Sequence, residues 1–221
     1  MKIAACLSWY DEPAHFLDRV IWSLSKTVDT VVALDGAWKL YPGGQPYSSL
    51  AQTETLEAAC AEFGLRFVGG TKYAEELWAS QVAKRDALMK LAAKTDADWL
   101  FVIDADEFVE RSDRELLEKL LDAATCDVAK VRCSRRDGRE SSIRRLYRAS
   151  AGVTVASAHN GYRTTDGRWL HGDGARVMLQ PALDVSSALA IYHDHDNRSE
   201  QRNDRARAYY RERRAQQIEW Q

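Results

Sequence analysis

The stretch Trp99-Leu-Phe-Val-Ile-Asp-Ala-Asp-Glu107 decides the fold. Its five apolar residues in a row predict a buried strand over Asp98–Ile103. The acidic run Asp104-Ala105-Asp106-Glu107 follows at once. Because ligands of open α/β sheets bind at the carboxyl ends of the strands, these carboxylates lie where a ligand is expected.

The residues on either side of this strand alternate between apolar runs and helical patterns. Further strands are expected at Ile3–Ser8, Thr30–Leu34 and Leu65–Val68, and helices over about residues 14–26, 50–63, 78–93 and 113–123. This order is typical of a mainly parallel α/β sheet flanked by helices on both faces. The segment Tyr41–Tyr47 holds two prolines and two glycines, so we expect a flexible loop there.

Beyond about residue 125 the pattern changes. Strand-like pieces alternate with arginine-rich and glycine-containing turns, at residues 128–133, 143–147, 153–156, 175–179 and 188–192. A polar, arginine-rich helix is expected over about residues 199–217. We predict a single domain over residues 1–221, in which a nucleotide-binding half (1–110) joins a mixed, β-rich half (111–221).

The composition is that of a soluble globular protein, with 45% hydrophobic and 29% charged residues. No apolar run approaches the roughly 18 residues of a membrane span, and the first residues do not resemble a secretory signal. The four cysteines form no Cys-x-x-Cys pair, which argues against a zinc knuckle or redox dithiol. Reduced thiols are expected, with Cys6 and Cys133 in the core. We therefore expect a cytoplasmic location, which is the host cytoplasm if a phage encodes the chain.

The formal net charge of −2 is unevenly distributed. Residues 1–110 hold 10 Lys and Arg against 17 Asp and Glu, and residues 111–221 hold 21 against 16. An acidic half beside a basic half is compatible with a site where a cation and a polyanion meet. Two differently solvated faces would give the same distribution.

Asp104 and Asp106 carry the strongest chemical signal. Alternate residues of an extended turn present their side chains to one side, and two carboxylates there suit Mg²⁺ or Mn²⁺ bridging a diphosphate. The simpler alternative is an acidic turn that caps the next helix. The buried strand before the pair, together with Asp35 at the end of another strand, favours the metal.

Three motifs in this order resemble the family 2 glycosyltransferases of the GT-A fold. They are Cys6-Leu-Ser-Trp-Tyr-Asp-Glu12, Val31-Val-Ala-Leu-Asp-Gly36 and the stretch 99–107. The resemblance covers about residues 1–110 well and the rest loosely. It implies a nucleotide-sugar-binding first half and an acceptor-binding second half that includes the C-terminal helix.

The resemblance also implies roles for individual residues. Ser8, Glu12 and Asp35 would hold the base and ribose of the donor. Asp104 would contact the ribose, and Asp106 would hold the metal and the diphosphate. The full set implied in donor binding is Ser8, Glu12, Asp35, Gly36, Lys84, Arg85, Asp104 and Ala105.

Lys84 and Arg85 lie on the helix expected over residues 78–93. Many members of the resembled family have a basic helix here, along the donor. Either side chain could neutralise phosphate, as a point charge or as a fork. The alternative is a solvated helix face.

The run Tyr192-His193-Asp194-His195-Asp196 follows the last apolar strand. A neutral imidazole is a suitable third ligand for Mn²⁺, and some GT-A enzymes use a C-terminal histidine in this way. Residues i and i+2 of a strand share a face, so His193 or His195 could serve. We favour His193, against a structural or surface pair.

An inverting transfer needs a base near the acceptor hydroxyl. The run Arg144-Arg-Leu-Tyr-Arg148 followed by His159 resembles the acceptor half of such enzymes, so His159 is a candidate site residue. The acidic pair usual in the family is not evident. Asp166 is typical of a turn, whereas Asp173 lies among glycines that allow close approach of a substrate, so Asp173 is our candidate base.

The sequence therefore favours a metal-dependent glycosyltransferase, inverting by family resemblance, that uses Mn²⁺ or Mg²⁺ and a nucleoside-diphosphate sugar, with a UDP-sugar favoured. The acceptor could be a glycan, a lipid-linked sugar, a protein side chain or a modified nucleobase in DNA. One alternative is a nucleotidyltransferase or other phosphoryl enzyme, although the loop after the first strand is acidic instead of basic. The other is a nucleic-acid-binding module, which the overall acidity disfavours.

Overall fold

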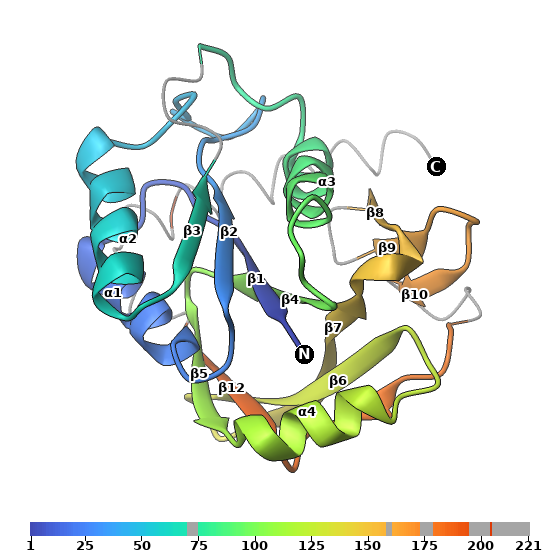
Figure 1. The fold of residues 1–221 in the computed structure, drawn as a ribbon. Helices are drawn as coiled ribbons and strands as arrows, with labels where there is room; N and C mark the ends of the chain where they lie inside the picture. The colour runs from blue at the N-terminus through green and yellow to red at the C-terminus, as the bar shows by residue number, and fades with distance from the viewer. Residues whose placement is uncertain (70–74, 158–160, 173–178, 195–203, 205–221) are drawn as a thin grey trace.

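The computed structural model describes residues 1–69, 75–157, 161–172, 179–194 and Asp204. In these residues the chain forms a nine-stranded sheet and a three-stranded sheet with four α-helices (Figure 1). The large sheet runs, in spatial order, through β3 (Arg66–Gly69), β2 (Thr30–Leu34), β1 (Ile3–Ser8), β4 (Trp99–Asp104), β7 (Glu140–Arg148), β6 (Val128–Arg135), β12 (Leu189–His193) and β5 (Glu107–Ser112). The short β11 (Leu183–Asp184) pairs with the start of β6.

The first half of the large sheet is parallel. Strand β1 pairs with β2 and β4, and β2 pairs with β3. The register places Ser8 beside Leu34 on one side and beside Asp104 on the other. The carboxyl ends of the three central strands therefore meet along one edge, as the sequence predicted.

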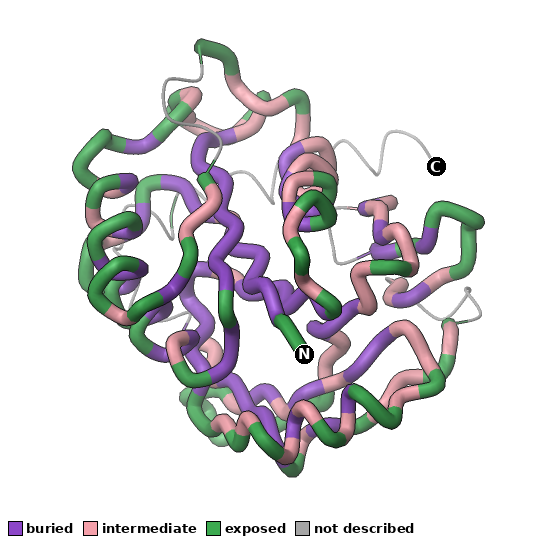
Figure 2. Tube along the Cα trace, viewed as in Figure 1, coloured by how far each residue is buried: buried purple, intermediate pink, exposed green. Residues whose placement is uncertain are grey.

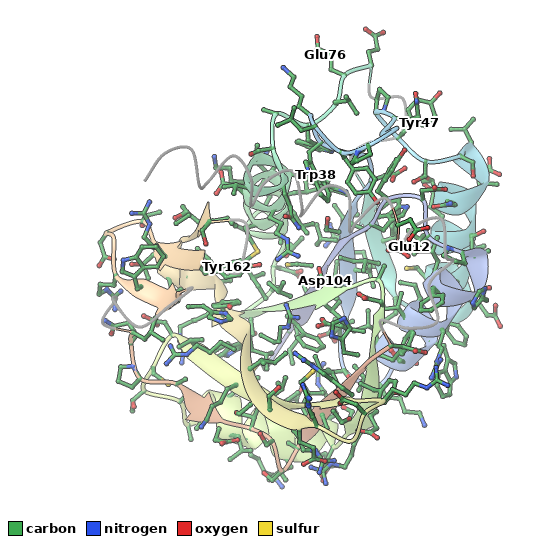
Figure 3. The ribbon with its side chains drawn as sticks, turned by 180° about the vertical axis from the view of Figure 1, so that it is seen from behind. Glu12, Trp38, Tyr47, Glu76, Asp104 and Tyr162 are labelled. Atoms are coloured by element: carbon green, nitrogen blue, oxygen red, sulfur yellow. The ribbon has the colours of Figure 1, made fainter. Side chains whose placement is uncertain are left out.

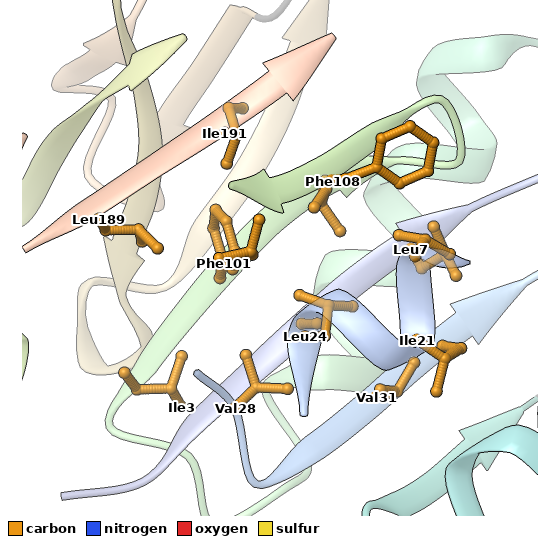
Figure 4. Packing of buried hydrophobic residues seen from close by; sticks show 14 of the residues in the cluster. Ile3, Leu7, Ile21, Leu24, Val28, Val31, Phe101, Phe108, Leu189 and Ile191 are labelled. Atoms are coloured by element: carbon orange, nitrogen blue, oxygen red, sulfur yellow. The ribbon is translucent and has the colours of Figure 1, made fainter. Parts of the chain in front are cut away.

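The helices α1 (Ala14–Leu24), α2 (Leu50–Glu62), α3 (Gln81–Ala92) and α4 (Arg114–Asp122) cover the sheet. Because alternate residues of β1 point to opposite faces, Leu7 packs in one apolar cluster with Ile21 of α1, and Cys6 packs in a second with Leu88 of α3. Figure 4 shows the first cluster between α1 and the strands. Figure 2 shows that successive residues of the central strands β1 and β2 are buried. The prediction of helices on both faces is confirmed.

The small sheet has the antiparallel order β10-β9-β8, formed by Trp169–His171, Gly161–Thr164 and Val153–Ser157. It packs beside α3, where the Asp86 carboxylate accepts a hydrogen bond from the Val155 N–H at 3.1 Å. It also contacts the large sheet, because the ring of Tyr162 stacks on that of Tyr147 with centroids 4.7 Å apart. The expected turn at Asp166 joins β9 to β10.

The structure corrects one expected boundary and excludes one alternative. Helix α3 begins at Gln81 instead of residue 78, because the Ser80 hydroxyl accepts the Ala83 N–H at 3.0 Å and caps the helix there. The acidic run after β4 does not cap the next helix. It leads into β5, and Asp113 caps α4 by accepting the Leu116 N–H at 3.0 Å.

Of the expected strand at 175–179, only Leu179 is among the described residues. Of the expected helix at 199–217, only Asp204 is. In the described part of the chain, no helix combines the length and the apolar character needed to cross a bilayer.

Candidate active site at the carboxyl edge of the sheet

The site lies where β1, β2 and β4 end. Strand β4 stops at Asp104, and the two residues Ala105 and Asp106 turn the chain into β5. Figure 3 labels Asp104, at the end of β4, and Glu12, in the loop that follows β1. The two aspartates of the Asp-x-Asp pair are held by different parts of the chain.

Asp106 is held by residues about 90 positions away in the chain. Its side chain is 3% exposed, and its Oδ2 lies 3.0 Å from Nε2 of His193. Its carbonyl accepts the Asp194 N–H at 2.8 Å. Pairing of β12 with β5 sets His193 opposite Glu107 and thereby brings the imidazole to the turn. The structure thus brings together the two residues that the sequence singled out as metal ligands.

The environment of His193 favours its protonated form. The hydrogen bond with Asp106 raises the pKa of His193 above its usual value, against the lowering effect of burial. The charges of Asp106, Glu107 and Asp104 add to the rise. Asp106 contacts the imidazole directly, whereas Asp104 and Glu107 act on it through their charge and are themselves paired with arginines.

Asp104 lies between two guanidinium groups. Its Oδ1 is 2.9 Å from an Nη of Arg85 on α3, and its Oδ2 is 3.8 Å from an Nη of Arg145 on β7. The Asp104 side chain is 28% exposed, so it can still reach a ligand. Arg85 therefore lies at the Asp-x-Asp pair, where the sequence expected a phosphate-binding cation.

Glu107 contacts the turn through its buried carboxylate. Its Oε2 accepts the Asp104 N–H at 3.1 Å, and its Oε1 forms an ion pair with Arg145. Burial raises the pKa of Glu107, and the charges of Asp104 and Asp106 add to this, whereas Arg145 lowers it. Sequence reasoning did not select Glu107 or Arg145. Both belong to motifs that it quoted, but only the pairing of β7 with β4 brings them together.

Asp35 is enclosed at the end of β2. Its carboxylate accepts the N–H and hydroxyl of Ser48, at 2.6 and 2.7 Å, and the N–H of Gly36 at 2.6 Å. Burial raises the pKa of Asp35, and these hydrogen bonds and Lys84 oppose the rise. The side chain is buried, with the residue only 1% exposed. Direct contact with a ligand therefore needs Ser48 to move.

Lys84 joins two loops instead of facing solvent. Its Nζ donates to the Trp9 carbonyl at 2.6 Å and to the Gly36 carbonyl at 2.7 Å, and the residue is 1% exposed. The side chain of Arg85 is only 12% exposed. The alternative of a solvated helix face is thus wrong for both residues. A phosphate contact by Lys84 remains a prediction.

The other expected donor-binding residues lie at the end of β1, in the loop after it and in the Asp-x-Asp turn. Ser8 is half-buried at the end of β1, Glu12 is 2% exposed, and Ala105 is buried in the Asp-x-Asp turn. A cavity of about 410 Å³ opens beside this loop. It is lined by Asp11, Glu12, Pro13, Ala14, Ser49, Ala51, Gln52 and Thr55.

Three candidate residues lie outside the described residues: Asp173, His159 and His195. Their roles therefore remain predictions. Within the part of the chain that the structure describes, no three His, Cys, Asp or Glu side chains gather closely enough to bind a metal ion by themselves. A metal bound here would have Asp106 and His193 as its protein ligands and would take its other ligands from substrate or water.

Comparisons with known proteins show a likeness of fold. No family model and no curated protein matches the sequence. Among solved structures, residues 1–349 of S. aureus TarS in complex with UDP match with a TM-score of 0.50 and 14% identity, over 69% of this chain and 48% of that chain. The same fragment with UDP-GlcNAc matches with a TM-score of 0.49 and 14% identity, over 69% and 46%. This chain spans about half the length of that fragment.

Proposed function

We propose that this chain is a glycosyltransferase with a GT-A type of fold, which moves a sugar from a nucleoside-diphosphate sugar to an acceptor hydroxyl. The observation that carries the proposal is the meeting of Asp104, Asp106 and His193 at the carboxyl edge of the parallel strands. The fold likeness to TarS, a glycosyltransferase, supports it. Because that fragment was solved with UDP, a UDP-sugar is the favoured donor.

A divalent cation is part of the proposal, and the donor set fits one. Asp106 supplies a carboxylate oxygen and His193 an imidazole nitrogen, 3.0 Å apart, which is close enough for both to reach one ion. Imidazole beside carboxylate suits Mn²⁺, whereas Mg²⁺ prefers oxygen ligands alone. The cation, when bound, stabilises negative charge on the departing nucleoside diphosphate.

The chain itself contributes positive charge next to the carboxylates. Arg85 on α3 reaches Asp104 at 2.9 Å, so a small change in its side chain would bring it to a phosphate beside Asp104. Arg offers a planar pair of donors that matches phosphate oxygens. We propose that Arg85 binds the diphosphate and that Asp104 binds the ribose.

The acceptor and the catalytic base complete the proposal. Asp173 is the proposed base, with His159 as a second candidate on the acceptor side. Transfer with inversion is proposed from the family resemblance, since a single base and a single displacement suffice for it. The excess of basic residues in the second half favours an anionic acceptor, of which DNA is one.

Thermal unfolding with UDP, GDP, CDP and TDP, each with and without Mn²⁺, tests this function. Ligand at about 100 times its dissociation constant adds roughly 2.7 kcal/mol. For a chain of this size the midpoint should rise by about 5–11 °C. We expect a Mn²⁺-dependent rise with UDP that is lost in Asp106→Ala.

The outcomes separate the alternatives. A rise with a nucleotide other than UDP keeps the glycosyltransferase and changes the donor. If no nucleotide shifts the midpoint in the presence of Mn²⁺, the donor site is wrong. Binding of nucleic acid that survives Asp106→Ala would then favour a nucleic-acid-binding module.

A further inference from the structure

We propose that Glu107 and Arg145 are positioning residues, whose buried ion pair holds the Asp104–Asp106 turn in the geometry that binds the donor diphosphate. What the turn binds rests on the proposed function. How the turn is held rests on the contacts between β4, β5 and β7.

Glu107 uses its two carboxylate oxygens for different purposes. Oε2 accepts the N–H of Asp104 at 3.1 Å, which fixes the peptide at which β4 ends. Oε1 forms the ion pair with Arg145. The side chains of Glu107 and Arg145 are 2% and 7% exposed, so water does not compete for these contacts. Rotation of Glu107 would release the Asp104 peptide.

Arg145 connects the turn to the second half of the chain. It comes from β7, which pairs with β4 through Leu100 and Tyr147. One of its Nη atoms reaches both Glu107 and, at 3.8 Å, the carboxylate of Asp104. Arg85 contacts the other carboxylate oxygen of Asp104, so two cations from separate elements hold this side chain.

The pair is not arranged for maximum stability. Buried ion pairs contribute weakly to folding, because desolvation of the two charges offsets their attraction. The Nε of Arg145 is buried, and among the described residues it has no hydrogen-bond partner, which itself costs stability. An apolar pair would fill this space without such a cost. The contacts with Asp104 give the charged pair a function in the site.

Four variants test the proposal. Arg145→Met and Glu107→Gln each remove one partner, and the double variant removes both charges, so that no unpaired charge stays buried. The matched control is Arg148→Met on the same strand. Arg148 pairs with Asp127 at 3.6 Å and lies over the ring of Trp99, away from the turn.

Two measurements are made on each variant. Hydrogen exchange of the peptide covering residues 104–107 reports how firmly the turn is held. Calorimetric titration with UDP in the presence of Mn²⁺ gives the dissociation constant. We expect faster exchange and binding weakened about 10–100-fold in the three site variants, as for other residues that orient metal ligands. Both substitutions remove the same contact between Glu107 and Arg145. The double variant should therefore bind UDP no more weakly than the single variant with the larger dissociation constant.

The Arg148→Met control shows the result expected of an arginine that only stabilises the fold. Arg148→Met should lower the unfolding midpoint but leave exchange at the turn and UDP binding unchanged. If the site variants behave in the same way, the ion pair is structural and the proposal is overturned. If the wild-type chain binds no UDP, the proposed function fails, and exchange at the turn still decides whether Glu107 and Arg145 position it.

Discussion

At the scale of single residues, the site is defined by charges that the fold has removed from water. As whole residues, Asp106, Glu107 and Asp35 are each at most 2% exposed. Asp106 and Glu107 are bound by His193 and Arg145 from other parts of the chain, and Asp35 is bound by the nearby Ser48 and Gly36. Burial penalises an isolated carboxylate, so these residues persist only because partners are provided. One of these contacts, between Asp106 and His193, leads to a prediction about pH dependence.

The His193–Asp106 pair should make stability depend on pH. The folded protein raises the pKa of His193, through its hydrogen bond with Asp106. A raised pKa gives stability that is complete below the unfolded value of about 6.5 and is lost as the pH rises through the folded value. With a chelator present, the wild-type midpoint should exceed that of His193→Gln most at acid pH, and the difference should shrink as the pH rises. Thermal unfolding across about pH 5.5–9 measures it, and a difference that grows with pH would contradict it.

Burial should also control thiol reactivity. Desolvation raises the pKa of Cys6 and of Cys60 to about 12, and both side chains are fully buried. Cys126 is half-buried. A reagent that reacts with cysteine thiolates should therefore label Cys126 first in the native protein. After denaturation it should label all four cysteines. Peptide mapping after brief labelling checks this, and early modification of Cys6 would refute it.

The sequence singled out Asp104, Asp106, Arg85 and His193, which the structure brings to one edge, but it missed Glu107 and Arg145. Asp104 and Asp106 follow a buried strand, which is a local pattern. His193 could be proposed because it also ends a strand. The partnership of Arg145 with Glu107 depends on which strands pair, and no local pattern contains that information.

At the scale of elements, the loop between β2 and α2 is closely packed where it follows β2. Gly36 has φ +99°, and a Cβ there would lie 2.1 Å from the carbonyl oxygen of Pro46. The carbonyl of Gly36 also accepts from Lys84. Any side chain at this position must displace the backbone that encloses Asp35.

Gly36→Ala should therefore lower the unfolding midpoint and abolish the UDP-dependent rise. Gly43→Ala is the matched control, because Gly43 also has a positive φ of +66° but open space around its Cα. In the control, the only expected loss is the roughly 1–2 kcal/mol that a side chain costs in a left-handed conformation. Its unfolding midpoint should fall by about 2–8 °C, and UDP binding should be kept. Thermal unfolding of both variants with and without UDP measures this. Equal effects would show that packing against Pro46 is unimportant.

Most elements of the first half were predicted to within about three residues at each end, because most of the strands are apolar runs. Strand β5 was not expected, since Glu107–Ser112 is mostly polar. It is a strand because β12, from the far end of the chain, pairs with it. The short β9 and β10 were missed for a similar reason, since each has few residues and depends on its neighbours.

At the scale of the whole molecule, the two halves share one sheet. Strand β4 pairs with β7, and β5 pairs with β12. We therefore expect a fragment of residues 1–112 to lack a cooperative unfolding transition, because β4 and β5 would lose their partners and expose apolar edges. Circular dichroism during heating of this fragment tests it. A sharp transition like that of the full chain would show that the first half folds as a separate domain.

The place of β12 in the sheet also determines the order in which the molecule can form. This strand fits between β6 and β5, so the hydrogen bond between Asp106 and His193 closes a loop of 87 residues. Contacts so distant along the chain form slowly, because closing a long loop costs chain entropy before any contact compensates for it. During synthesis, β5 leaves the ribosome long before β12 exists and must wait with its edge unpaired. We therefore expect the contact between Asp106 and His193 to form among the last events of folding, and until then the unpaired edge of β5 is open to pairing with other copies of the chain.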